Sequence, residues 1–111
     1  MSDQIEITPL QLQAKLQSGE KITVIDVREP AEEAIAKLPG ALLIPMQSVP
    51  AQLQRIEGLA DEGDLAILCH HGVRSLNVTV WLKRNGVENC FSVAGGIDRW
   101  SAEIDPAIPR Y

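Results

Sequence analysis

Short apolar runs alternate along this chain with segments whose apolar residues recur at helical spacing. The apolar runs predict β-strands at residues 5–7, 22–26, 41–45, 64–69 and 90–93. Three of these runs, "ITVID", "ALLIP" and "DLAILC", are largely apolar or β-branched without alternation. That pattern is typical of strands that are buried on both faces of a sheet.

Helices are predicted in the segments between the strands. Thr8 is a suitable N-cap and Pro9 a suitable first helical residue, so a helix is expected through 10–19, ending at Gly19. Further helices are expected over residues 30–37, 49–59 with Ser48 as its cap, 75–85 and 94–104. Strands that alternate with helices need crossover connections, which predicts the α/β class with a parallel sheet covered by helices on both faces.

Length and charge narrow the classes of function. The 111 residues are expected to form one domain, and their net charge of −5 argues against binding to nucleic acid through bulk charge. No apolar run approaches the ~18 residues that span a bilayer, and the first residues lack the basic and apolar regions of a signal peptide. We therefore expect a cytoplasmic protein without nucleic-acid or membrane partners.

Two cysteines are present, Cys69 and Cys90, and neither lies in a CxxC or zinc-type spacing. In a cytoplasmic chain two reduced thiols are expected rather than a disulfide. Cys90 lies inside an apolar strand and is interpreted as inert packing, with a role as a resolving thiol for Cys69 as the alternative.

The stretch "CHHGVRS" joins the most apolar strand to a helix within a few residues. The strand ends at Cys69 and the helix is expected from Ser75, so the chain must turn sharply, and Gly72 permits a positive φ in that turn. Successive N–H groups in such a loop form an anion-binding nest, which the helix dipole reinforces. A thiol at this place is favoured in its thiolate form, which is the nucleophile.

The charged residues of this loop support the same interpretation. Arg74 offers a planar fork that suits an oxyanion, and His70 and His71 titrate near neutrality and could add positive charge. Paired histidines also suggest a metal, but no third ligand lies at a suitable spacing, so no metal is expected. We therefore predict a reactive Cys69 in an anion-binding loop, rather than a buried structural cysteine.

The size of the loop separates two kinds of chemistry. Four residues separate Cys69 from Arg74, whereas protein phosphatases that use cysteine carry one residue more. A smaller ring of amides suits a single sulfur atom better than a phosphoryl group, so sulfur is the expected cargo. A cysteine phosphatase or arsenate reductase is the disfavoured alternative.

At this point the sequence resembles the rhodanese-like, or thiosulfate sulfurtransferase, family. Four motifs carry the resemblance in the order that the family shows: "VIDVREPAEE", "LPGALLIP", "CHHGVRS" and "VAGGIDRW". The resemblance covers residues 5–104, and the tail 105–111 is similar to that of small bacterial single-domain members. It implies a five-stranded, mostly parallel sheet flanked by helices within one domain, residues 1–111.

The resemblance also implies a mechanism and a set of site residues. Cys69 would be the nucleophile that takes sulfur from a donor and holds it as a persulfide. Arg74 would bind the anionic end of the donor or brace the loop. No cofactor is implied. The backbone of the loop would cradle the persulfide, through residues His70, His71, Gly72, Val73 and Ser75.

The resemblance implies partners as well. The donor would be a small anion such as thiosulfate, and a loop with two histidines and an arginine suits that dianion better than mercaptopyruvate. Cyanide, a thiol or a thioredoxin-like protein would be the acceptor. One departure from the family is Lys37, where many members carry histidine; we interpret Lys37 as structural. The rival function is a non-enzymatic persulfide carrier or interaction module, loaded by a partner protein.

The sequence also predicts structural roles for several residues outside this loop. Asp26 and Arg28 follow a buried strand and are expected to support the loops through an ion pair or hydrogen bonds. Gly95 and Gly96 are expected to supply backbone conformations that side chains forbid. The two tryptophans are expected to be core or helix-packing residues rather than substrate contacts, and four glutamates are expected on solvated faces. These residues are Trp81, Trp100, Glu32, Glu33, Glu57 and Glu62.

Overall fold

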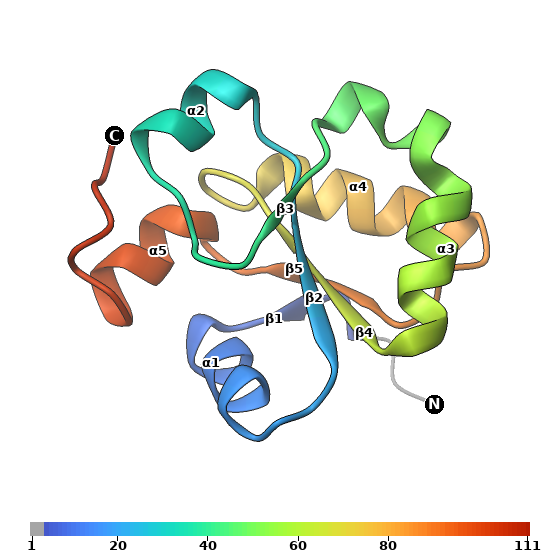
Figure 1. Ribbon diagram of the computed structural model, residues 1–111, viewed down its shortest axis with the longest axis horizontal. Helices are drawn as coiled ribbons and strands as arrows, with labels where there is room; N and C mark the ends of the chain where they lie inside the picture. Colours follow the sequence, from blue (N-terminus) through green and yellow to red (C-terminus); the bar gives the residue numbers. More distant parts are fainter. Residues whose placement is uncertain (1–3) are drawn as a thin grey trace.

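The computed structural model describes residues 4–111, which form an α/β domain around a five-stranded sheet (Figure 1). Its strand order is β1-β5-β4-β2-β3, and every neighbouring pair is parallel. The strands are β1 (Glu6–Ile7), β2 (Ile22–Asp26), β3 (Leu42–Leu43), β4 (Asp64–Leu68) and β5 (Cys90–Val93). The predicted class and the parallel sheet are confirmed.

Five α-helices and two short 3₁₀ turns connect these strands within the described residues. The helices are α1 (Pro9–Gln17), α2 (Pro30–Ile35), α3 (Leu53–Glu62), α4 (Val73–Arg84) and α5 (Gly96–Glu103). The 3₁₀ turns are η1 (Met46–Ser48) and η2 (Pro50–Gln52). No helix in this part of the chain is long and apolar enough to span a bilayer.

Helices cover both faces of the sheet, as the strand pattern requires (Figure 1). Along β4, Leu65 and Ile67 pack with residues of α3 and α4, whereas Ala66 and Leu68 pack with residues of α1 and α5. All four side chains are buried. Alternate residues of one central strand therefore enter two separate cores, which explains why its sequence shows no polar alternation.

Local sequence explains the start of α1, whereas several predicted boundaries, including three in α3, α4 and β3, differ from the structure. Thr8 caps α1 as predicted, with its hydroxyl accepting from the Gln11 N–H. Ser48 does not cap α3: it lies in η1, and α3 begins only after Gln52. The predicted start of α4 at Ser75 is also wrong, because Gly72, with φ of +102°, is its N-cap and Val73 its first residue.

The third difference concerns the predicted strand at residues 41–45. Only Leu42–Leu43 pair with β2, and both side chains are half-buried. The cause is their position, because β3 is one of the two edge strands of the sheet and has a partner on one side alone.

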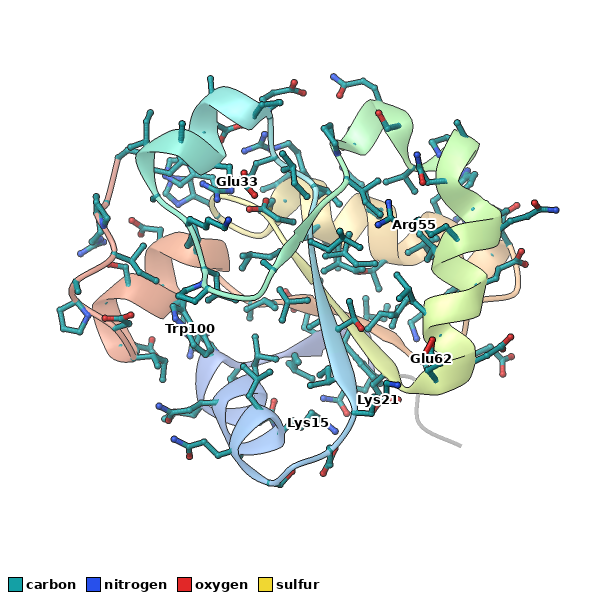
Figure 2. The ribbon with its side chains drawn as sticks, viewed as in Figure 1. Lys15, Lys21, Glu33, Arg55, Glu62 and Trp100 are labelled. Atoms are coloured by element: carbon teal, nitrogen blue, oxygen red, sulfur yellow. The ribbon has the colours of Figure 1, made fainter. Side chains whose placement is uncertain are left out.

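The register brings the loops after β2, β4 and β5 to one edge of the sheet. Asp26 of β2 lies beside Leu68 of β4, and Ser92 of β5 lies beside Ile67. The residues that follow each strand therefore meet at this carboxyl edge, where open parallel sheets bind ligands. At the other edge, Lys21 and Glu62 form an exposed ion pair of 2.7 Å (Figure 2).

Candidate functional site

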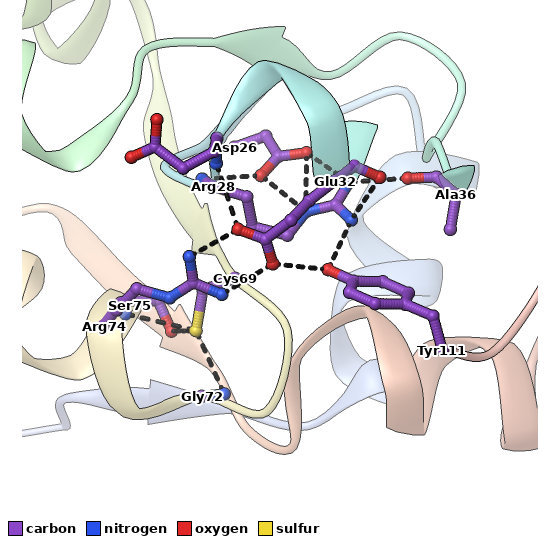
Figure 3. A network of polar contacts seen from close by, with 10 residues as sticks. Asp26, Arg28, Glu32, Ala36, Cys69, Gly72, Arg74, Ser75 and Tyr111 are labelled. Carbon is purple, nitrogen blue, oxygen red and sulfur yellow. Dashed lines mark hydrogen bonds and ion pairs between the residues drawn. The ribbon is translucent and has the colours of Figure 1, made fainter. Parts of the chain in front are cut away.

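Cys69 is the first residue after β4, and its sulfur lies inside the loop that follows (Figure 3). The Gly72 N–H donates to Cys69 Sγ at 3.0 Å, and the Ser75 N–H donates to it at 3.3 Å. The Cys69 thiol donates to Ser75 Oγ, also at 3.3 Å. The sulfur therefore sits at the focus of backbone amides, in the first turn of α4, as an anion would.

Two amides of the predicted cradle contact the sulfur of Cys69 itself. The predicted cradle comprises the amides from His70 through Ser75, but among residues 4–111 only those of Gly72 and Ser75 donate to the sulfur. Val73 turns its side chain to solvent, with 69% of it exposed. Its part in the loop is therefore confined to the first backbone position of α4.

Backbone N–H groups at the start of α5 donate hydrogen bonds to the loop that carries Cys69. The Ile97 N–H donates to the Cys69 carbonyl at 2.8 Å, and the Asp98 N–H donates to the His70 carbonyl at 3.1 Å. Gly96 has φ of +60°, and a Cβ at this position would lie 2.4 Å from the His70 oxygen. Only glycine permits this approach of two backbones, which explains the second glycine of "AGG" by its contact with the active loop, residues 69–75.

The hydroxyl of Ser92 contacts the hydroxyl of Ser75. Ser75 Oγ and Ser92 Oγ are 2.7 Å apart, and both residues are fully buried. The Ser75 hydroxyl thus contacts the Cys69 thiol on one side and Ser92 on the other. No sequence pattern pointed to Ser92, because a serine in an apolar strand carries no signal until the helix that packs against it is known.

Arg74 is paired with a carboxylate that the sequence analysis placed in solvent. Its two terminal nitrogens donate to Glu32 Oε1 at 2.7 Å and to Oε2 at 2.9 Å (Figure 3). The hydrogen bond from Arg74 is the main cause that lowers the pKa of Glu32 to about 2. The expectation of a solvated Glu32 is therefore wrong: residue 32 lies on α2, whose first turn faces the active loop.

Asp26 and Arg28 form a buried ion pair directly beneath this contact. Arg28 Nη2 lies 2.7 Å from Asp26 Oδ2, and both side chains are almost completely buried. The same guanidinium donates to the Ala36 carbonyl at 2.6 Å and the Glu32 carbonyl at 3.2 Å. Arg28 thereby ties the end of β2 to α2, and it positions the helix that carries Glu32.

Tyr111 joins these groups, and no sequence pattern pointed to it. Its hydroxyl donates to Glu32 Oε2 at 2.7 Å and accepts from Arg28 Nη1 at 2.8 Å. Its ring stacks on His70, with the centroids 3.7 Å apart. The tail that ends the sequence thus lies against the active loop.

The two histidines of the loop approach Asp98. His71 Nδ1 is 3.9 Å from Asp98 Oδ2, and the rings of His70 and His71 are 3.8 Å apart. One donor atom from each of His70, His71 and Asp98 lies within 4.8 Å of the others, so these three could hold a metal ion. The fold thus brings a carboxylate beside the two histidines that the sequence spacing did not reveal. Asp98, however, already accepts hydrogen bonds from Arg110 Nε at 2.9 Å and Nη2 at 3.0 Å.

Three other interpretations can be compared with the structure. Cys90 is fully buried, and its burial raises the pKa of its thiol to about 11. It pairs in register with Leu65, four residues before Cys69, or roughly 13 Å along the sheet. A direct disulfide cannot span that distance, which argues against Cys90 as a resolving thiol. Lys37 is exposed, and Trp100 lies in the core.

Trp81 has a different environment from Trp100. It is only partly buried, and it lines a largely apolar hollow between the 3₁₀ turns and α4. None of the loop residues from Cys69 to Ser75 lines this hollow. Its lining residues are Met46, Val49, Pro50, Asn77, Val78 and Trp81.

Comparison with known proteins agrees with this geometry. The sequence model of the rhodanese-like domain matches residues 8–103. The chain is 36% identical to the thiosulfate sulfurtransferase GlpE of Haemophilus influenzae, over 96% of each chain. The chain is also 36% identical to the chloroplastic rhodanese-like/PpiC domain-containing protein 12 of Arabidopsis thaliana, where the match covers 91% of this chain. It spans only 35% of that longer protein.

Solved structures show the same fold. The crystal structure of SSP1007 from Staphylococcus saprophyticus superposes with a TM-score of 0.79 at 33% sequence identity. The match covers 95% of this chain and 98% of that one.

Proposed function

Because the chain belongs to the rhodanese-like domain family, we propose that it is a sulfurtransferase that holds sulfane sulfur as a persulfide on Cys69. The observation that supports this most directly is the pair of N–H groups, from Gly72 and Ser75, that donate to Cys69 Sγ. Relatives named as sulfurtransferases support the same class of reaction.

In the first half-reaction the Cys69 thiolate attacks the outer sulfur of the donor. With thiosulfate, the S–S bond of the donor breaks and sulfite leaves with the bonding electron pair, while a new S–S bond forms at Cys69. The negative charge moves to the outer sulfur of the persulfide. N–H groups that point at the sulfur before reaction stabilise this charge without reorganisation.

In the second half-reaction a thiophilic acceptor attacks the outer sulfur. Cyanide forms thiocyanate, and the electron pair of the persulfide bond returns to Cys69 as a thiolate. The Ser75 hydroxyl, which accepts from the Cys69 thiol, can donate to the Cys69 thiolate. When Cys69 is a thiol, the Ser75 hydroxyl can donate instead to Ser92 Oγ, which is 2.7 Å away. A thiol, small or on a thioredoxin-like protein, is an equivalent acceptor.

Arg74 is assigned the role of bracing the loop. Both of its terminal nitrogens are engaged by Glu32, so the guanidinium anchors the first turn of α4 to α2. His70 and His71 line the rim of the loop, and Asp26 and Arg28 support it from the core. These residues position the loop, whereas Cys69 and the Gly72 and Ser75 amides take part in the chemistry.

Three measurements test the proposed sulfurtransferase function against the rival functions. Intact mass spectrometry after incubation with a sulfur donor should show one added sulfur atom on the wild type and none on Cys69→Ser. Steady-state turnover with cyanide distinguishes an enzyme from a carrier that needs a partner for loading. Hydrolysis of an aryl phosphate that disappears in Cys69→Ser would instead support a phosphatase.

A further inference from the structure

The cations at the mouth of the active loop are each matched by a carboxylate. Arg74 faces Glu32, and Arg110 faces Asp98. The third pair, Arg28 with Asp26, is buried behind them. These three arginine charges are therefore balanced by their partners, although the sequence of the loop by itself suggests a cationic rim.

Glu32 is held in place by more than its ion pair. Its carboxylate accepts from both terminal nitrogens of Arg74, from the Tyr111 hydroxyl at 2.7 Å, and from the Glu29 N–H at 3.2 Å. Only 20% of the Glu32 side chain is exposed. A carboxylate with four donors is ionised at neutral pH and does not turn away readily, so the Arg74 charge is already paired and its two N–H groups that face Glu32 are occupied.

This arrangement affects donors according to their charge. Thiosulfate carries two negative charges on a compact body. Beside Arg74 it would meet the carboxylate of Glu32, whereas the sequence of the loop by itself suggests an unpaired guanidinium. An organic persulfide, R–S–SH, carries at most one charge on the sulfur atoms that react. The Gly72 and Ser75 amides take up that charge, and Arg74 is not needed for it.

We propose that Glu32 is a specificity-determining residue that disfavours small dianionic donors and leaves the site suited to organic persulfides. The inference rests on the proposed sulfurtransferase function and names the donor class of that same site. In the corresponding step the Cys69 thiolate attacks the outer sulfur of R–S–SH, the S–S bond breaks, and RS⁻ leaves with the bonding pair. The proton remains on the outer sulfur of Cys69 until water removes it.

The test compares two donors on two matched variants. Glu32→Gln removes the charge but keeps an oxygen for Arg74 and for the Glu29 N–H, and Glu33→Gln makes the same charge change on the next residue of α2. Glu33 makes no side-chain hydrogen bond or ion pair within residues 4–111. The donors are thiosulfate and the persulfide of 2-mercaptoethanol, whose carbon skeleton is uncharged. The second-order rate of sulfur loading on Cys69 is followed by quenched intact mass.

The expected result is a change in donor preference rather than in overall rate. Glu32→Gln should raise the loading rate with thiosulfate by about tenfold, as expected when one charge near a dianion is removed. Any loosening of the Arg74 brace would slow both donors alike, so the ratio of the thiosulfate rate to the persulfide rate is the decisive quantity, and it should rise by about tenfold in Glu32→Gln. Glu33→Gln should change neither rate. The gain with thiosulfate should shrink as ionic strength rises, a response that a purely structural role of Glu32 would not produce.

A second variant guards against misfolding. Tyr111→Phe removes one donor from Glu32, and it should shift donor preference in the same direction by a smaller factor. Equal changes with both donors in Glu32→Gln, or slower loading from thiosulfate alone, would overturn the specificity inference while leaving the proposed function intact. Absence of loading from either donor on the wild type would overturn the proposed function and the inference with it.

Discussion

The ring of Tyr111 lies stacked on the ring of His70, with the centroids 3.7 Å apart and the planes 5° from parallel. His70 follows Cys69 directly, and Tyr111 also hydrogen-bonds Glu32 and Arg28. One aromatic side chain from the tail therefore contacts both the active loop and the network that braces it.

Replacing Tyr111 should separate these two contacts. Tyr111→Phe keeps the ring but loses the hydroxyl, and Tyr111→Leu loses both. The ring-current shift of the His70 protons in NMR spectra should persist in the first variant and disappear in the second. Urea unfolding should show a loss of about 1 kcal/mol for Tyr111→Phe and more for Tyr111→Leu. An unchanged His70 spectrum in Tyr111→Leu would contradict the stacking.

Removing the Ser75 hydroxyl should slow sulfur loading. Ser75→Ala loses the partner of the Cys69 thiol and leaves Ser92 Oγ buried without its neighbour. We expect loading to slow by roughly tenfold and unfolding free energy to fall by about 1–3 kcal/mol. Ser101→Ala is the control, because it removes another buried hydroxyl, bound to the Ile108 carbonyl. It should lose stability without slower loading; slower loading in both variants would assign the effect to general destabilisation.

Gly96 should tolerate no side chain. In Gly96→Ala the new Cβ would overlap the backbone of Cys69 and His70, and the φ of +60° adds strain. The active loop must move, so persulfide loading should be lost and the melting temperature should fall. Gly58→Ala in α3 is the opposite case, since nothing lies within 4 Å of its Cβ. It should stabilise the protein by about 0.5–1 kcal/mol.

Breaking the buried ion pair should cost more than breaking an exposed one. Arg28→Met leaves the Asp26 carboxylate buried without its cation, and urea unfolding should show a loss of about 3–5 kcal/mol. Lys21→Met breaks the exposed pair with Glu62 and should change stability little. The double variant Asp26→Leu/Arg28→Met should be more stable than Arg28→Met alone. Equal losses in the buried and exposed variants would show that Asp26 is not desolvated.

The Glu32–Arg74 pair should make stability depend on acid pH. Folding lowers the pKa of Glu32 from 4.5 to about 2, mainly through the hydrogen bond from Arg74. The charged form is therefore favoured in the native state, so this stabilisation is present above pH 4.5 and is lost as the pH falls to about 2. Urea unfolding across this range should show a smaller decline in Glu32→Gln than in the wild type. Parallel declines would mean that Arg74 does not bind Glu32 in solution.

Local patterns in the sequence determined much of the fold and the position of Cys69. Apolar runs predicted where strands lie, and Thr8 with Pro9 predicted the start of α1, because these signals act within a few residues. The junction of the strand with "CHHGVRS" placed Cys69 at the carboxyl edge of the sheet for the same reason. The predicted boundaries were wrong where a neighbouring element sets the length of a strand or helix, as at β3, which pairs with a single strand.

Tertiary structure alone decided the surroundings of the nucleophile. Glu32 is 42 residues from Arg74 and 79 from Tyr111, and Ser92 is 17 from Ser75. No periodicity or spacing encodes such pairs, since they arise from strand order and crossovers. The sequence therefore identified a thiol and an arginine in one loop, but only the packing of α2 and the tail against that loop shows that the arginine's charge is already paired.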